Sequence, residues 1–134
     1  MSTFLYADIY KMEDPITHKW NWNLDDPKNV WGPVGWRWLH RLCINFKLTP
    51  KKADRDNFIS AVWGFITQLP CIECRSHAST YIMNNPPDTS SRYSLEFWAF
   101  NFHNAVNERL HKKIISFEDY QEYYAEDIRL AGIH

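Results

Sequence analysis

The hydrophobic residues after position 30 recur at the spacing of α-helices, and prolines or polar clusters separate the runs. This pattern predicts a first helix that opens at Gly32-Pro33, because proline is well tolerated in a first turn. Its apolar stripe continues as far as Phe46. A second helix is predicted from Thr49-Pro50 to Pro70, with apolar residues at i, i+3, i+4, i+7, i+8 and i+11 counted from Phe58.

The second half of the chain shows the same period, interrupted by one polar loop at residues 85–93. A third helix is predicted from Cys71 to Asn84-Asn85-Pro86-Pro87, a stretch that a helix does not easily continue through. Ser94 is the expected N-cap of a fourth helix through Lys112. Ser116 resembles the start of a capping box and opens a short fifth helix. The predicted fold is therefore all-α, a four-helix bundle with a short fifth helix.

The first 30 residues lack this period and contain prolines and a polar stretch, so residues 1–30 are predicted to form a largely irregular N-terminal arm. A length of 134 residues fits one domain, which we place at residues 31–134. Residues 1–14 show no cationic-then-apolar order, and the sequence contains no run of about eighteen apolar residues. Neither a signal peptide nor a transmembrane helix is predicted.

Charge and composition narrow the range of partners. The formal net charge is −1, which gives no reason to expect nucleic acid or an anionic membrane as a partner. Aromatic residues make up 16% of the chain and include seven tryptophans and eight phenylalanines. These large planar side chains suit a planar ligand or a hydrophobic subunit interface, although plain core packing also accounts for them.

The chain has three cysteines, and two of them form the Cys-x-x-Cys sequence at Cys71 and Cys74. Zinc sites, redox pairs and structural bridges all use this spacing. Zinc needs about four ligands, and no second pair of ligands follows at a usual spacing. A structural bridge this short constrains little of the chain. The favoured interpretation is a redox-active pair at a helix start, which promotes the reactive thiolate, with Cys43 as a bystander.

Two of the predicted helices carry a second stripe of residues, whose side chains could bind a ligand. On the first helix the stripe consists of Gly32, Trp36, His40 and Cys43, and on the fourth of Phe100, His103, Asn104 and Asn107. The histidine and amide groups suit the edge of a nucleobase, with Phe100 available for stacking. The alternative for the first helix is a core tryptophan beside a satisfied histidine. Arg109, Lys112 and Lys113 could meet phosphates or simply complement the helix dipole.

Three stretches together resemble one known family. Residues 31–40 read Trp-Gly-Pro-Val-Gly-Trp-Arg-Trp-Leu-His, residues 69–74 read Leu-Pro-Cys-Ile-Glu-Cys, and residues 102–110 read Phe-His-Asn-Ala-Val-Asn-Glu-Arg-Leu. They are similar, in order and spacing, to the flavin, active-site and His-Asn-x-Val-Asn signatures of the Erv/ALR sulfhydryl oxidases, which make disulfides with FAD. The compact layout is most like the members encoded by large cytoplasmic DNA viruses.

The resemblance implies a role for each matching residue. Cys74 would lie against the flavin ring, and Cys71 would be the interchange thiol that forms a mixed disulfide with the substrate. The residues implied to line FAD within the bundle are Gly32, Trp36, His40, His103, Asn104 and Asn107. The residues implied to approach its phosphates or ribose are Lys112, Arg109 and Lys113. Family members are usually homodimers through their first two helices, and the same is expected here.

The implied activity is the oxidation of protein dithiols by O₂, which gives a disulfide and H₂O₂. Cellular members carry a second Cys pair in a flexible tail, and this chain has none. Electrons would therefore come directly from a thiol-containing protein substrate or through a small dithiol relay protein. The viral resemblance implies the host cytoplasm, virus assembly sites or the virion as location. The competing interpretation is a non-enzymatic helical interaction module whose Cys pair is incidental or binds zinc.

Overall fold

The computed structural model describes residues 27–132, and the regular structure in this range is entirely helical. Its four long helices are α2 (Pro27–Ile44), α3 (Lys52–Thr67), α4 (Ile72–Asn84) and α5 (Arg92–Arg109). Two short helices, α6 (Phe117–Tyr123) and α7 (Ala125–Ala131), follow them. The predicted four-helix bundle is confirmed, and the predicted fifth helix is divided in two at Tyr124.

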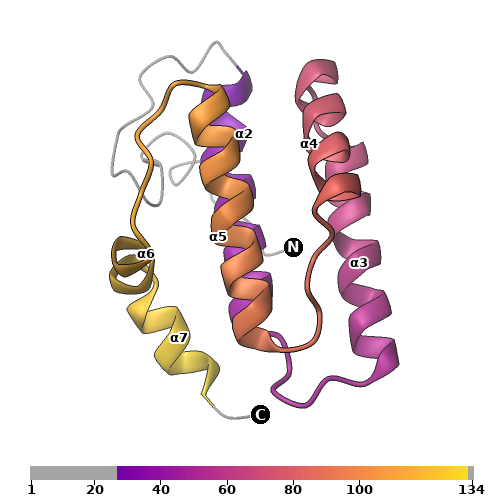
Figure 1. Cartoon of the computed structure of the whole chain (residues 1–134), viewed down its shortest axis with the longest axis vertical. Helices are drawn as coiled ribbons and strands as arrows, with labels where there is room; N and C mark the ends of the chain where they lie inside the picture. Colours follow the sequence, from indigo (N-terminus) through magenta and orange to yellow (C-terminus); the bar gives the residue numbers. More distant parts are fainter. Residues whose placement is uncertain (1–26, 133–134) are drawn as a thin grey trace.

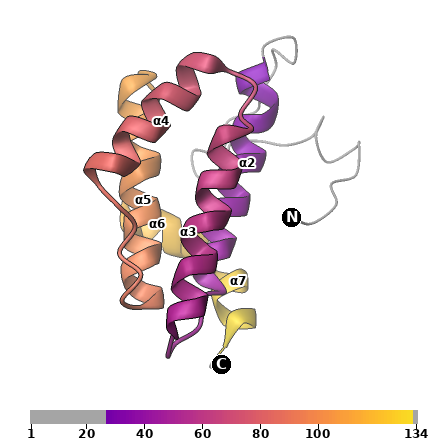
Figure 2. The same cartoon turned by 90° about the vertical axis from the view of Figure 1, so that its right-hand side faces the viewer.

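The four long helices run alternately in opposite directions along the long axis of the molecule (Figure 1). α2 and α5 lie side by side and make the most extensive contact between any two helices of the described chain. α3 and α4 flank this pair on one side, and α6 and α7 lie along the other (Figure 1). In the view turned by 90°, α3 and α4 lie in front of the pair (Figure 2). As a result, the starts of α2 and α4 and the ends of α3 and α5 lie at the same end of the bundle.

Three helix starts differ from the predicted ones. α2 begins at Pro27 rather than at Gly32, so Pro33 lies inside the helix. The last residues of the predicted arm are therefore helical, and the rest of that arm lies outside the described residues. α3 begins at Lys52, after the predicted Thr49-Pro50 start. α5 is capped by Ser91 rather than Ser94, because the Ser91 Oγ accepts the Ser94 N–H at 3.0 Å.

The end of α5 also differs from the prediction, because the helix stops at Arg109 instead of Lys112. His111 adopts a φ of 57°, in the left-handed region. The N–H groups of His111 and Lys112 donate to the carbonyls of Glu108 at 3.1 Å and Asn107 at 2.7 Å. These two bonds form a Schellman motif, which satisfies helix carbonyls and turns the chain away from the axis. Lys112 and Lys113 consequently belong to the linker that leads to α6.

Two clusters of buried side chains hold the helices together. The larger cluster joins α2, α3, α4 and α5 around Leu39, Phe58, Ile82 and Leu95. The smaller cluster docks α6 and α7 onto the α2–α5 pair, and its members are Ile44, Phe100, Ile115, Tyr120, Tyr124 and Ala131. Burial of apolar surface stabilises such a fold by about 25 cal/mol per Å².

Within residues 27–132, no helix combines the length and apolar character needed to cross a membrane.

Polar contacts fasten α6 and α7 to the bundle as well. The Tyr120 hydroxyl of α6 donates to the Glu96 carboxylate of α5 at 2.9 Å. The Arg41 guanidinium of α2 pairs with the Asp127 carboxylate of α7 at 3.1 Å. Ser116 caps α6 as predicted, since its Oγ accepts the Asp119 N–H at 3.0 Å. The short C-terminal helices are therefore a fixed part of the structure.

Candidate active site

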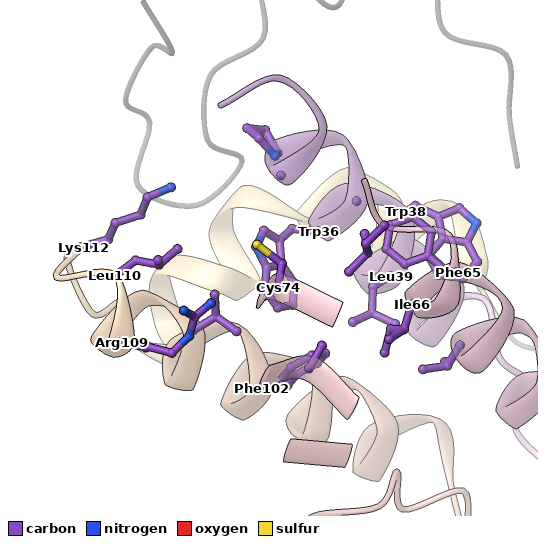
Figure 3. A pocket seen from close by; sticks show the side chains of 17 residues that line it. Trp36, Trp38, Leu39, Phe65, Ile66, Cys74, Phe102, Arg109, Leu110 and Lys112 are labelled. Carbon is purple, nitrogen blue, oxygen red and sulfur yellow. The ribbon is translucent and has the colours of Figure 1, made fainter. Parts of the chain in front are cut away.

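A cavity of about 250 Å³ lies at the end of the bundle where the four helix ends meet. Most of its lining is apolar, with two cations on the α5 side (Figure 3). The lining residues are Gly32, Pro33, Gly35, Trp36, Trp38, Leu39, Val62, Phe65, Ile66, Leu69, Cys74, Ala78, Phe102, Val106, Arg109, Leu110 and Lys112. Ligand pockets usually enclose about 300–1,000 Å³. At about 250 Å³, the cavity is therefore large enough for only part of a larger ligand.

Two glycines of α2 shape this cavity in different ways. A Cβ at Gly35 would lie 2.7 Å from Cζ of Phe65, so any larger residue at position 35 would force the Phe65 ring to shift. A Cβ at Gly32 would meet no atom within 4 Å in the described chain. The helix backbone at Gly32 is thus open to the cavity, which agrees with the space that the sequence predicted beside it.

The two cysteines of the pair occupy different places at the start of α4. Cys71 is the N-cap residue, and its Sγ accepts the Cys74 N–H at 3.2 Å. Cys74 lies in the first turn and lines the cavity, whereas Cys71 is not among the lining residues. The predicted position of the pair at a helix start is confirmed. An N-cap thiol that accepts a backbone N–H is favoured as a thiolate by that bond and by the helix dipole.

His40 of α2 and His103 of α5 form a buried pair beside the cavity, with His40 Nε2 2.9 Å from His103 Nδ1. Trp36, a lining residue, stacks on the His103 ring with centroids 4.1 Å apart and 9° between the planes. Burial, and then the charge of Lys112, lower the pKa of His103 to about 3. Its imidazole is therefore neutral near neutral pH.

The second nitrogen of His103 points to a ligand. His103 Nε2 is buried and has no hydrogen-bond partner within residues 27–132. Buried polar atoms in folded proteins are nearly always hydrogen-bonded, since leaving one unsatisfied costs about 1–3 kcal/mol. A ligand with a polar edge at this position would satisfy it.

The two asparagines of α5 have different surroundings. The Asn104 amide is used by the chain itself: its Nδ2 donates to the Ile115 carbonyl at 2.9 Å, and its Oδ1 accepts the Ile115 N–H at 3.1 Å. Asn104 thereby fixes the linker that carries Lys112. Asn107 is buried, and its Nδ2 lies 3.5 Å from Asn104 Oδ1. Asn107 is the amide of the two that retains hydrogen-bonding capacity for a ligand.

The structure separates some predicted residues from the cavity. Phe100, predicted to be available for stacking, packs instead on Phe117 and Tyr120 in the smaller core cluster, because its side of α5 is covered by α6. Arg109 and Lys112 both line the cavity (Figure 3), whereas Lys113 is exposed and is not a lining residue.

One wall of the cavity was missed by the reasoning from sequence. This wall is formed by Val62, Phe65 and Ile66 of α3 and by Leu69, which follows the helix. Their helical spacing is the same as that of any buried face. The one available signal was Gly35, which interrupts the apolar stripe of α2 where Phe65 approaches. Phe65 also stacks on Trp38, with ring centroids 4.7 Å apart.

Cys43 lies in the larger core cluster, away from the pair. Burial, and then the charge of Glu96, raise the pKa of the Cys43 thiol well above its ordinary value. The thiol is thus held protonated and unreactive, in keeping with a bystander. In the part of the chain that the structure describes, no cluster of three or more His, Cys, Asp or Glu side chains could hold a metal ion.

Together, the fold and the site define a small helical protein with a dithiol motif at the mouth of an apolar ligand cavity. The Erv1 / Alr family matches residues 33–125, and the chain belongs to this family. The resemblance found in the three sequence stretches is thereby confirmed.

Similar proteins include viral and fungal members. The "FAD-linked sulfhydryl oxidase" of African swine fever virus (isolate Tick/Malawi/Lil 20-1/1983) is 42% identical over 98 residues, covering 73% of this chain and 82% of that protein. The "FAD-linked sulfhydryl oxidase ERV2" of Saccharomyces cerevisiae is 32% identical over 90 residues, covering 67% of this chain and 46% of that protein.

The fold is also found among solved structures. The FAD binding domain of Erv1 from Saccharomyces cerevisiae matches with a TM-score of 0.67 at 24% identity, covering 72% of this chain and 91% of that one. The yeast Erv1 core matches with a TM-score of 0.66 at 25% identity, covering 69% and 79%. These likenesses confirm the helical architecture.

Proposed function

We propose that this protein is an FAD-dependent thiol oxidase, which passes two electrons from a protein dithiol to O₂ and yields a disulfide and H₂O₂. The observation that carries this function is the arrangement of the Cys pair, with Cys74 in the cavity lining and Cys71 outside it. One cysteine can thus face a planar cofactor while the other meets a substrate. The printed names of the viral and yeast relatives support the same activity.

The residues of the site fit FAD. The cavity has apolar and aromatic walls, the backbone is open at Gly32, and His103 Nε2 is a buried polar atom that calls for a partner. The cavity would hold the flavin ring beside Cys74. The residues that would contact the cofactor are Gly32, Trp36, His40, His103 and Asn107, with Arg109 and Lys112 toward its phosphates or ribose. Asn104 would instead fix the linker that carries Lys112, and the exposed Lys113 lies outside the lining. When bound, FAD supplies the two-electron chemistry that links thiols to O₂.

The chain's own thiols carry out the exchange with substrate. A substrate thiolate attacks the Cys71 sulfur of the oxidised pair, and Cys74 leaves as a thiolate. The second substrate thiol then attacks the mixed disulfide and releases Cys71, so the substrate ends as a disulfide and the pair is reduced. The Cys74 N–H, 3.2 Å from the Cys71 Sγ, favours Cys71 as the leaving thiolate. Cys74 is half-buried and lies in the lining beside these apolar walls.

The test of this function is direct. Purified protein should be yellow, and it should consume O₂ when a small dithiol such as dithiothreitol is added. Cys71→Ser and Cys74→Ser should each abolish this consumption. A colourless protein that neither binds added FAD nor consumes O₂ would support the interaction module instead.

We also propose that the chain forms a homodimer through α2 and α3. Ile59 and Trp63 on α3 are only partly buried by the chain itself, and apolar side chains of this kind suit a subunit interface. Sedimentation should give the mass of a dimer, and Trp63→Glu should give a monomer that still binds FAD. A monomeric parent protein would exclude this interface.

The substrate and the location are proposed on the viral relatives. The electrons would come from a thiol-containing protein, directly or through a small dithiol relay protein, in the host cytoplasm, at virus assembly sites or in the virion. In Cys74→Ser, the Cys71 thiolate should attack the disulfide of this protein in its oxidised form, which releases one of its thiols and leaves a mixed disulfide on Cys71 that no Cys74 thiol can resolve. Affinity purification without reductant should recover the adduct, and Cys71→Ser should recover none.

A further inference from the structure

The connection from α3 to α4 leads directly into the redox pair. Gln68 is the C-cap of α3, and Cys71 is the N-cap of α4. Between them, the Leu69 N–H donates to the Ile66 carbonyl at 3.2 Å, while Pro70 has no N–H to donate. Contacts from side chains can therefore add to the backbone hydrogen bonds that hold this turn.

Arg75 lies one helical turn after Cys71 and contacts the turn between α3 and α4. The Arg75 Nη1 donates to the Leu69 carbonyl at 2.6 Å, and the Arg75 backbone N–H donates to the Cys71 carbonyl at 3.0 Å. Hydrogen bonds from a charged donor are shorter and stronger than neutral ones. Within residues 27–132, the Arg75 guanidinium forms an ion pair with no carboxylate.

We propose that Arg75 is a positioning residue for the redox pair. By fixing the Leu69 carbonyl, it fixes the turn that presents Cys71, and so keeps the Cys71 sulfur on the Cys74 N–H at 3.2 Å. The inference deepens the proposed function, in which Cys71 is the thiol that exchanges with substrate.

The chain contains a matched arginine in an equivalent setting. Arg55 lies at the corresponding position of α3, where its backbone N–H donates to the Lys51 N-cap carbonyl at 3.1 Å and its Nη1 donates to the Pro50 carbonyl at 3.0 Å. Like Arg75, it is partly buried. Arg55 stabilises a helix start that carries no cysteine. Comparing variants of Arg55 and Arg75 therefore distinguishes a general effect on stability from a specific effect on the Cys71 thiol.

The experiment uses the full chain with Cys74→Ser, which leaves Cys71 as the reactive thiol and keeps the backbone N–H at position 74. The rate at which iodoacetamide alkylates Cys71 is followed by peptide mass spectrometry. Arg75→Met should slow this rate about tenfold, and Arg75→Lys, which keeps the charge and a donor, should restore most of it. Arg55→Met should lower the melting temperature comparably and change the rate less than about twofold.

Two results would overturn the proposal: an unchanged rate in Arg75→Met, or an equal slowing in Arg55→Met. If Arg75→Met melts below the assay temperature, Arg75→Gln replaces it with the same expectation and the same overturning results. Alkylation requires neither flavin nor turnover. Failure of the proposed function would instead appear as a parent protein that does not oxidise dithiols, whatever the alkylation rates.

Discussion

At the scale of single residues, the two thiols of the pair differ in surroundings, and this difference assigns their chemistry. Cys74 lines the cavity, whereas Cys71 caps α4 outside the lining. A thiolate at position 74 would therefore contact the flavin, and a thiolate at position 71 would not. The two serine variants should consequently differ in their spectra although both lose turnover.

We expect Cys71→Ser to retain FAD and to show a broad long-wavelength absorbance, because the Cys74 thiolate remains beside the flavin. Cys74→Ser should retain FAD without this band. Absorbance spectra of the purified variants, compared with the parent protein, measure the difference. If the band appears in Cys74→Ser instead, the roles of the two cysteines are reversed.

His103 and Asn107 are expected to bind the nucleotide half of FAD. Loss of a hydrogen bond to a buried ligand edge costs about 1–3 kcal/mol, or roughly ten- to a hundredfold in affinity. His103→Ala and Asn107→Ala should thus purify partly without flavin, with lower melting temperatures that excess FAD raises again. Phe100→Leu, in the smaller core cluster of the same helix, is the control and should lose stability without losing flavin. Full flavin content in both alanine variants would exclude the nucleotide site.

Helical spacing placed His103 and Asn107 on one face of α5, and the structure buries both. It also placed Phe100 and Asn104 there, but spacing does not say which neighbour covers a face. Phe100 meets α6, and the Asn104 amide meets the Ile115 backbone, because α6 docks across that part of α5. Contacts between segments that are distant in the chain cannot be predicted from the local spacing of residues.

At the scale of elements, the end of α5 holds a residue in an unfavourable conformation. His111 has a φ of 57° at the position of a Schellman motif where glycine is usual. We expect His111→Gly to stabilise the protein by about 1 kcal/mol, since the left-handed conformation costs a residue with a Cβ roughly 1–2 kcal/mol. Urea denaturation measures this gain. Lys113→Gly, in the linker without a positive φ, should give no gain, and equal effects of both changes would contradict the explanation.

The existence and order of the helices could be predicted because their apolar periods are long. Their ends could not be predicted as well, because a cap depends on one hydrogen bond among several candidates. Ser91 and Ser94 are both acceptable caps, and the structure uses the Ser91 hydroxyl as acceptor and the Ser94 N–H as donor. α5 lacks its last predicted turn because the Schellman motif ends the helix at Arg109. Glycine usually marks this motif in a sequence, and here the residue is His111.

At the scale of the whole molecule, the buried His103 should make stability depend on pH. Its pKa is about 3 in the folded state, against an ordinary value of 6.5. Between these values the unfolded chain binds a proton that the folded chain does not, so stability falls as pH falls from 6.5 toward 3. We expect a loss of about 2 kcal/mol between pH 7 and pH 5.

Urea denaturation of the flavin-free protein at both pH values measures this loss. His103→Gln, which removes the titrating group but keeps a polar side chain, should show a clearly smaller dependence on pH over the same interval. Parallel pH profiles for the variant and the parent would assign the dependence to other groups.

The cavity at the shared end of the bundle has a consequence for the order of assembly. Its walls come from α2, α3, α4 and α5 and from the segments that follow α3 and α5, and the lining residues range from Gly32 to Lys112 along the chain. No single helical hairpin encloses the space, so the pocket does not exist until the last of the four helices has docked. Binding of the flavin therefore requires the assembled bundle, and bound flavin indicates that the chain has folded. The yellow colour regained after dilution from denaturant cannot develop faster than the bundle itself forms.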